Sequence, residues 1–215
     1  MRGFRIVLLA LGALLALAVV CIGGLYAYAA IDREDKFFVV DAQPLDPDYL
    51  LKPFTAGSRD AREHLGHGVH RLQRGRGIVL AERFYSNGSV NSIDDEYFRK
   101  LTVWIPGGPP QAEALFDLSD RANVLVFLSQ GGSAWPRDAC SGHVSTGTMR
   151  VARKGARYQV SLHGQFSPHG NAGSVRDCKA SPVDIEFAAT ELQFSKLTPW
   201  LGSADGKHPY AETYR

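Results

Sequence analysis

From residue 77 onward, hydrophobic residues tend to recur at every second position, which is the period of a half-buried β-strand. Three stretches combine this pattern with many β-branched and aromatic residues and with bounding Gly, Pro, Asn or Asp: IVLAERFY (78–85), YFRKLTVWI (97–105) and NVLVFLSQ (123–130). In the second stretch, Leu101, Val103 and Ile105 share one face. The third is apolar on both faces, which is typical of a central strand.

The segment GTMRVARKGARYQVSLHGQF (147–166) predicts a β-hairpin. Met149 and Val151 alternate with polar residues, and RKG supplies the turn. Four apolar residues then continue on one face: Tyr158, Val160, Leu162 and Phe166. In VDIEFAATELQF (183–194) the apolar residues move from odd to even positions, which predicts a bulge or tight turn near 188–190.

Seven or eight strands with little helix predict an all-β domain. The expected architecture is an antiparallel β-sandwich, and the alternative is a closed β-barrel. In a barrel, the row that begins at Tyr158 would line a cavity instead of filling a core. One short helix is expected near 59–65, because Ser58 suits its N-cap and Gly66 suits its C-terminal end.

The N-terminal pattern is different, since the run from Ile6 to Ile31 is apolar and carries no charge. As a helix it would extend ~39 Å, enough to cross a hydrocarbon layer of about 30 Å with some tilt. Arg2 and Arg5 precede the run and the acidic DREDK follows it, so we expect a cytoplasmic N-terminus. The sequence thus predicts a single-pass signal-anchor in the inner membrane, with lipid around this transmembrane helix and a periplasmic or extracellular domain.

Two other fates of this segment deliver the same exported domain. Ala27-Tyr28-Ala29 resembles a signal-peptidase site, and Cys21 is a candidate for lipid attachment. The expected organisation is an anchor over 1–31, an extended linker or arm over 32–57 with three prolines, and a β-domain over 58–215. Two of the 24 Lys and Arg residues precede the anchor, which leaves 22 against 22 Asp and Glu. The exported part is therefore neutral and lacks the basic field that nucleic-acid binding requires.

Cys140 and Cys178 flank the predicted hairpin and are the two cysteines of the exported part. In an oxidising compartment such a pair predicts a disulfide. Closing the 39 residues from 140 to 178 would contribute about 4 kcal/mol on the chain-entropy model. The alternative is a zinc site formed by the same two cysteines with His143 and His169.

The stretch EHLGHGVH (63–70) also suggests metal chemistry. On a helix, His64 and His67 would lie close enough to share an ion, whereas His70 would not join them. No acidic residue makes an H-E-x-x-H arrangement, so we interpret the stretch as a helix end followed by a loop.

Two loops contain chemically conspicuous residues. LSQGGSAWPRD presents Ser133, but a nucleophile elbow needs glycine where Trp135 stands. Trp135 and Trp200 both lie in proline-containing loops and are the candidates for partner binding. No catalytic residue and no cofactor is predicted.

These patterns predict an envelope protein that binds another protein or organises a complex through a tethered β-domain. One alternative is a small-molecule or lipid binder, if the strands close around a cavity. Another is an enzyme whose site is carried on loops that are far apart in sequence.

Overall fold

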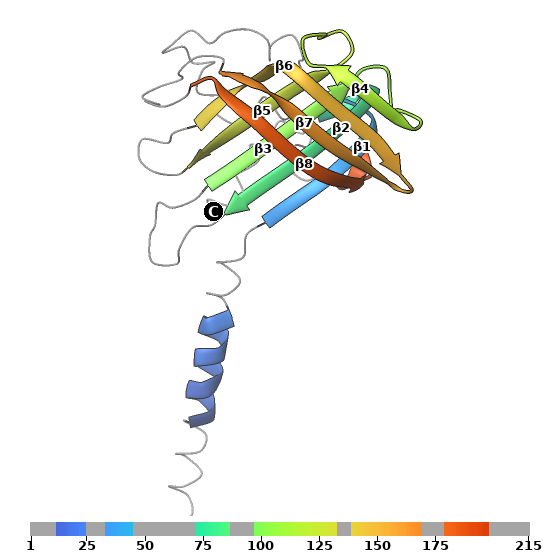
Figure 1. Cartoon of the computed structure of the whole chain (residues 1–215). Helices are drawn as coiled ribbons and strands as arrows, with labels where there is room; N and C mark the ends of the chain where they lie inside the picture. The colour runs from blue at the N-terminus through green and yellow to red at the C-terminus, as the bar shows by residue number, and fades with distance from the viewer. Residues whose placement is uncertain are drawn as a thin grey trace, which may run out of the picture.

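A computed structural model of the chain describes residues 12–24, 33–44, 72–86, 97–132, 139–168 and 179–197. Residues 12–24 form a helix, and the later described residues contain eight strands, one 3-10 helix and the turns between them (Figure 1). The elements are β1 (Arg33–Pro44), β2 (Leu72–Ser86), β3 (Tyr97–Ile105), β4 (Glu113–Asp117), β5 (Leu125–Gly132), β6 (Ala139–Lys154), β7 (Arg157–Pro168), β8 (Ser181–Glu191) and η2 (Phe194–Lys196).

All eight strands belong to one sheet in the order β4-β6-β5-β3-β2-β1-β8-β7. Because β7 also pairs with β6, the hydrogen bonding of seven strands runs in a ring, and β4 adds to the side of β6. The prediction of a mostly β domain is confirmed. The strands form one sheet with ring-like bonding, whereas a sandwich would divide them between two sheets.

The sheet is mixed, which corrects the expectation of a fully antiparallel arrangement. β1 and β8 run parallel and pair at two positions, Phe37 with Thr190 and Phe38 with Glu191. The other strand pairs are antiparallel. The parallel pair follows from the odd number of strands in the ring, because six successive antiparallel pairs leave β8 running in the same direction as β1.

The predicted strands and the predicted hairpin are present. The stretches 78–85, 97–105 and 123–130 lie largely in β2, β3 and β5, and β6 and β7 form the hairpin with Lys154 opposite Arg157. β5 lies between β3 and β6 and is buried on both faces, with Phe127 on one and Val126 on the other. Double-sided apolar patterning therefore correctly indicated a central strand.

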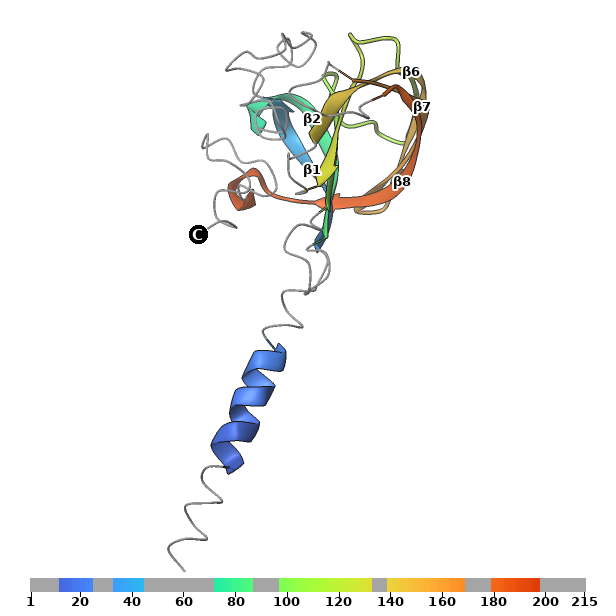
Figure 2. The same cartoon turned by 90° about the vertical axis from the view of Figure 1, so that its left-hand side faces the viewer.

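The bulge expected near 188–190 is absent, since β8 pairs regularly with β7 from Ser181 to Thr190. The apolar positions change parity because the chain leaves the sheet after Glu191. Leu192 and Phe194 then pack on the outer face of β1 and β2, where the chain enters η2 (Figure 2). The alternation thus changes faces at the end of the strand and not within it.

Part of the segment predicted as a linker or arm, 32–57, is a strand of the sheet. β1 occupies Arg33–Pro44 and pairs with β2 from Arg33–Tyr85 to Pro44–Leu72, with one irregularity between Val40 and Ala42. The short helix expected near 59–65 lies outside the described residues.

The described N-terminal helix, 12–24, carries exposed apolar side chains such as Leu15 and Val20. In the described part of the chain, no helix combines the length and the hydropathy needed to cross a bilayer. Both flanks of the predicted anchor, 1–11 and 25–31, lie outside the described residues.

The ring encloses one hydrophobic core to which each of its seven strands contributes. Phe38 of β1 meets Tyr158 of β7 edge to face, with ring centroids 4.9 Å apart. The row of the hairpin that was expected to face inward is fully buried here: Tyr158, Val160, Leu162 and Phe166. A second cluster covers the outer face of β1 and β2, and η2 contributes Phe194 to it.

Candidate functional site

Most of the residues that the sequence singled out lie outside the described residues. These are the three histidines of 63–70, Ser133, Trp135, His169, Cys178 and Trp200. Cys140 is the second residue of β6, where only its backbone is described. The disulfide, the zinc site and the tryptophan partner sites therefore remain predictions.

The strand register shows where the connections that carry some of these residues leave the ring. We call the end at which β1 begins the entry end. The ends of β2, β5 and β7 lie there, as do the beginnings of β3, β6 and β8. The connections 87–96, 133–138 and 169–178 thus all join strands at the entry end, with Cys140 beside them. Trp200, by contrast, follows η2 along the chain and lies outside the described residues.

His143, one of the candidate zinc ligands, contacts a cation within the described part of the chain. Its Nε2 lies 3.0 Å from the guanidinium of Arg121, which can only donate, so Nε2 is the acceptor. Burial, and then the charge of Arg121, lowers the pKa of His143. In this arrangement Arg121 occupies the lone pair of His143 Nε2. Among the described residues, no group of three or more His, Cys, Asp or Glu side chains is arranged to hold a metal ion.

Two cations that the sequence analysis did not select are fully buried. Arg83 of β2 and Lys100 of β3 are directly opposite each other in the antiparallel ladder, and both have no exposed surface. The Arg83 guanidinium lies 3.4 Å from Thr102 Oγ1 and 5.7 Å from the centre of the Phe37 ring. Next to Lys100 along the same row is the buried Ser129 of β5. This polar row crosses the outer face of the sheet near the entry end.

The inner face near the entry end carries an ion pair. Glu82, which is 2% exposed, accepts a bidentate contact from the guanidinium of Arg99, with Nε 3.2 Å from Oε2. The hydrogen bond that Arg99 donates to Glu82 raises the pKa of Arg99, against an opposing effect of burial. The hydrophobic core ends at this pair, where the negative charge of the buried Glu82 is compensated by the adjacent Arg99.

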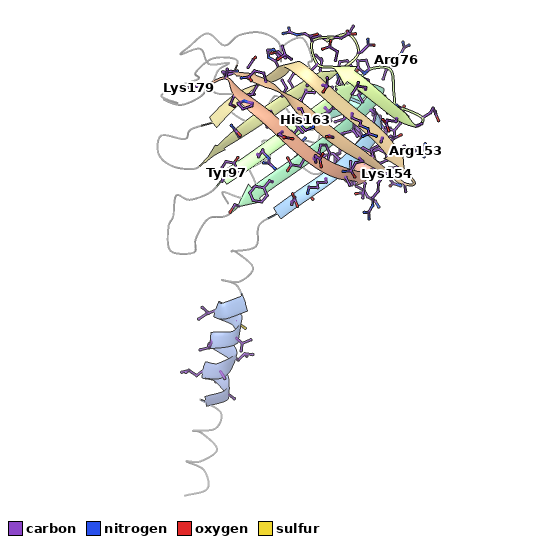
Figure 3. All side chains as sticks on the ribbon, in the orientation of Figure 1. Arg76, Tyr97, Arg153, Lys154, His163 and Lys179 are labelled. Atoms are coloured by element: carbon purple, nitrogen blue, oxygen red, sulfur yellow. The ribbon has the colours of Figure 1, made fainter. Side chains whose placement is uncertain are left out.

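A third polar group lies on the outer face of β7 and β8 (Figure 3, where His163 is labelled). Asp184 Oδ1 is 3.0 Å from His163 Nδ1, and His163 Nε2 is 3.2 Å from Ser161 Oγ. Ser161 Oγ is also 3.0 Å from Glu186 Oε1. We call these four residues the Asp184 network.

The protonation of this network follows from the single proton on the hydroxyl of Ser161. If Ser161 donates to Glu186, His163 Nε2 must donate to Ser161, and the imidazole is then protonated on both nitrogens. If the imidazole is neutral, Ser161 donates to His163 and Glu186 loses that bond. The network thus has two hydrogen-bond arrangements, which differ by one proton.

The neutral arrangement has the connectivity of a Ser-His-Asp triad, the chemistry that an enzyme interpretation would require. Its surroundings do not resemble such a site. The side chains of His163 and Asp184 are 58% and 75% exposed, and Glu186 competes for the hydroxyl proton. A nucleophile needs exclusion of water and preorganised donors for an oxyanion, and a pair of neighbouring strands facing solvent supplies neither. We therefore interpret the Asp184 network as a polar surface feature.

Sequence patterns do not reveal these residues, for two reasons. Arg83 and Lys100 occupy positions that alternate with core residues, and this pattern normally indicates a solvent-facing side. Ser161 and Asp184 are 23 positions apart along the chain, so only the pairing of β7 with β8 brings them together. The alternation of polar residues on both strands indicated an exposed face but not which residues meet across it.

Comparison of the chain with protein-family models, with curated proteins and with solved structures found no match.

Proposed function

We propose that this chain is a membrane-anchored, extracytoplasmic β-domain that binds another protein and so acts as a component of an envelope complex. The observation that carries the proposal is an open sheet edge. β8 pairs along its length with β7, but on its other side it meets β1 only at Thr190 and Glu191 within the described strands. A strand edge with unpaired backbone groups is a template for the strand of a partner.

The apolar N-terminal run supports the anchored part of the proposal. Its described portion, 12–24, presents apolar side chains to the surroundings on all sides, including Leu14, Leu17 and Ile22. Such a helix is stabilised by lipid and not by the domain core. The arginines before the run and the acidic residues after it support an orientation with the β-domain outside the cytoplasm.

The core favours a partner-binding domain over a small-molecule or lipid binder. We propose that the ring is a barrel with a packed interior, in which β1 and β8 close the hydrogen bonding only at Thr190 and Glu191. The support is the row of Val160, Leu162 and Phe166, which lies within one cluster of mutually packed side chains from all seven ring strands. A ligand site of useful size would need a few hundred Å³ that such side chains do not enter.

The test is purification of the full-length tagged chain in mild detergent, followed by determination of the mass of the particle. We expect a second protein in fixed stoichiometry, retained through a size-exclusion step. Recovery of the chain as a lone monomer, from membranes that were never exposed to harsh detergent, would contradict the proposal.

A further inference from the structure

We infer that the open edge of β8 receives an extended segment of the partner, and that this segment carries basic side chains at alternate positions. The inference rests on the proposed function and specifies the chemistry of its binding site. The site consists of the edge from Pro182 to Ala188 and of two outward acidic side chains on it, Asp184 and Glu186.

The hydrogen bonding at the end of β8 shows which backbone groups face the edge. The Leu192 amide donates to the Phe38 carbonyl at 2.8 Å, so even-numbered residues direct their backbone groups toward β1. Backbone direction alternates along a strand. Asp184, Glu186 and Ala188 therefore present their N–H and C=O groups on the side away from β7.

This assignment agrees with the side-chain contacts on the opposite side of β8. The odd-numbered residues must then form the hydrogen-bonded pairs with β7, and the even-numbered ones the non-hydrogen-bonded pairs, in which side chains lie closest. The observed contacts fit, since Asp184 meets His163 and Glu186 meets Ser161 across the ladder.

β1 and β8 converge at the arrowhead of β8 and diverge toward the beginning of β8 (Figure 1). At the first of the two paired positions, the Thr190 hydroxyl also donates to the Lys36 carbonyl at 3.2 Å. Backbone direction alternates along a strand, so Glu34, two residues before Lys36 in β1, also directs its backbone groups toward the side on which β8 lies. A strand added to β8 would thus lie on the side of β8 that faces β1, along the part of β8 that does not pair with β1.

The side chains of the edge alternate between core and solvent. Val183 and Phe187 are buried at 8% and 3% exposure, whereas the side chain of Asp184 is 75% exposed and Glu186 is also exposed. An added strand that continues the sheet would keep this alternation. Its outward residues would lie beside Asp184 and Glu186, and its inward residues would extend the hydrophobic core.

The acidic pair selects the occupant by charge. In antiparallel pairing with a second copy, a two-fold axis at 184, 185 or 186 would place a carboxylate of one copy opposite a carboxylate of the other. Like charges directly opposite each other destabilise a sheet. Lysine or arginine at alternate positions would instead gain a cross-strand partner, so the edge rejects its own copy and favours a basic strand.

β4 is the other edge strand of the described sheet, and its acidic side chains have different partners from those of β8. Its carboxylate at Glu113 is already paired with Arg150, at 2.8 Å and 2.9 Å, and Asp117 receives hydrogen bonds from Ser119 and, at its carbonyl, from Asp120. Leu115 is the exposed residue between them. β4 is thus the matched control for an edge whose carboxylate at Glu113 is paired with a guanidinium, whereas Asp184 and Glu186 contact the His163 imidazole and the Ser161 hydroxyl.

The experiment measures binding of a fluorescent peptide that alternates lysine and valine to the full-length chain in detergent, with a peptide that alternates glutamate and valine as its counterpart. We expect the basic peptide to bind and the acidic one not to bind. The double variant Asp184→Lys/Glu186→Lys should weaken binding of the basic peptide about tenfold or more and exchange the preference. The control Glu113→Lys/Asp117→Lys changes the net charge equally and should leave the preference unchanged.

A second variant tests the backbone contribution independently of charge. Ala188→Pro removes an edge N–H but no bond to β7, so it should weaken peptide binding, whereas Leu115→Pro on the β4 edge should not. Equal effects of the two charge variants, or of the two proline variants, would overturn the inference. A dimer of the full chain that is lost in Ala188→Pro would also overturn it, because the edge would then belong to a second copy.

These outcomes separate the inference from the function on which it rests. If the chain co-purifies with a protein and Asp184→Lys/Glu186→Lys leaves that complex intact, the basic-strand inference is wrong and the proposed function stands. If no protein co-purifies but the peptide preference is present and exchanges as expected, the edge chemistry is supported and the envelope function is contradicted.

Discussion

Arg83 and Lys100 place two cationic side chains on adjacent strands, in positions without solvent access. Removing a charge from water has a large unfavourable free energy, and a protein lowers this cost by neutralising the group or by solvating it with polar side chains. Thr102 and Phe37 contribute to this solvation for Arg83. For Lys100, burial, and then the charge of Arg83, lowers the pKa well below its ordinary value of 10.5.

The lowered pKa of Lys100 has a consequence for stability. Between that lowered value and 10.5, the unfolded chain binds a proton that the folded chain does not, so the free energy of unfolding rises as the pH rises through this window. The slope from this one group is at most about 1.4 kcal/mol per pH unit. Lys100→Met should remove this slope, as measured by urea denaturation at several pH values. Identical pH profiles of the two proteins would contradict the assignment.

The ion pair of Glu82 and Arg99 on the inner face predicts that the loss of a buried carboxylate and the loss of an exposed ion pair have different effects on the free energy of unfolding. Glu82→Gln should lower the free energy of unfolding by about 1.5–3 kcal/mol, because the half-buried Arg99 keeps its charge and loses its carboxylate. Arg150→Gln breaks a bidentate pair of similar geometry on the exposed surface and should change stability little. Denaturation curves of both variants are the measurement, and equal losses would contradict the role of burial.

Sequence patterning does not reveal these residues, and the reason is physical. Arg99 and Lys100 occur at the start of a strand in YFRKLTVWI, where polar residues usually mark the end of burial. Burial of Lys100 depends on what packs over the outer face of the sheet, and strand periodicity contains no information about that second layer. The row of Leu101, Val103 and Ile105 was predictable because it depends only on alternation within one strand.

The hairpin of β6 and β7 contains a β-bulge, a local irregularity that bends the strand and so helps the sheet to curve. Its register shifts between Val144 and Thr146, and Gly147 follows with a φ of 114°. A Cβ at Gly147 would collide with the carbonyl oxygen of His163 in the paired strand. The position therefore requires glycine both for its backbone conformation and for the close approach of β7.

Substitution of this glycine gives a prediction with an internal control. Gly147→Ala should lower the free energy of unfolding by about 3 kcal/mol or more, from strain and steric overlap together. Gly155→Ala, in the hairpin turn, has a φ of 62° but open space around its Cβ and should cost about 1–2 kcal/mol. Urea denaturation of both variants tests the ranking, and a reversed order would show that the bulge is not built as described.

Elements with a strong internal period were predictable, and elements defined by their neighbours were not. The β6–β7 hairpin was predicted because turn and alternation are local. β4 has five residues, too few to establish a period, and β1 was included in a proline-containing linker although FFVV carries a strand pattern. The misassigned bulge in β8 has the same origin, because Leu192 and Phe194 pack on a face that another part of the chain creates.

At the scale of the molecule, the ring depends on contacts between distant parts of the chain. β1 meets β8 across about 150 residues, and the Thr190 hydroxyl reaches the Lys36 carbonyl. Such closure cannot be read from alternation, which is the same in a sandwich and in a closed sheet. The open edge of β8, on which the proposed function rests, is a property of this closure and was accordingly absent from the sequence analysis.

The predicted disulfide joins Cys140, the second residue of β6, to Cys178, which lies outside the described residues. We expect non-reducing peptide mapping to recover the two cysteines in one cross-linked fragment, and reduction to cost about 4 kcal/mol. Alkylation of both before reduction, or stoichiometric zinc in elemental analysis, would contradict the disulfide.

We propose that the membrane tether holds the β-domain, with the open edge of β8, outside the cytoplasm. Protease accessibility in spheroplasts of a cell that produces the full-length chain tests this orientation. We expect protease added outside to digest the domain from β1 to β8 while the membrane stays intact and cytoplasmic markers survive. Digestion only after lysis of the inner membrane would contradict the orientation, and with it the proposal of an extracytoplasmic partner.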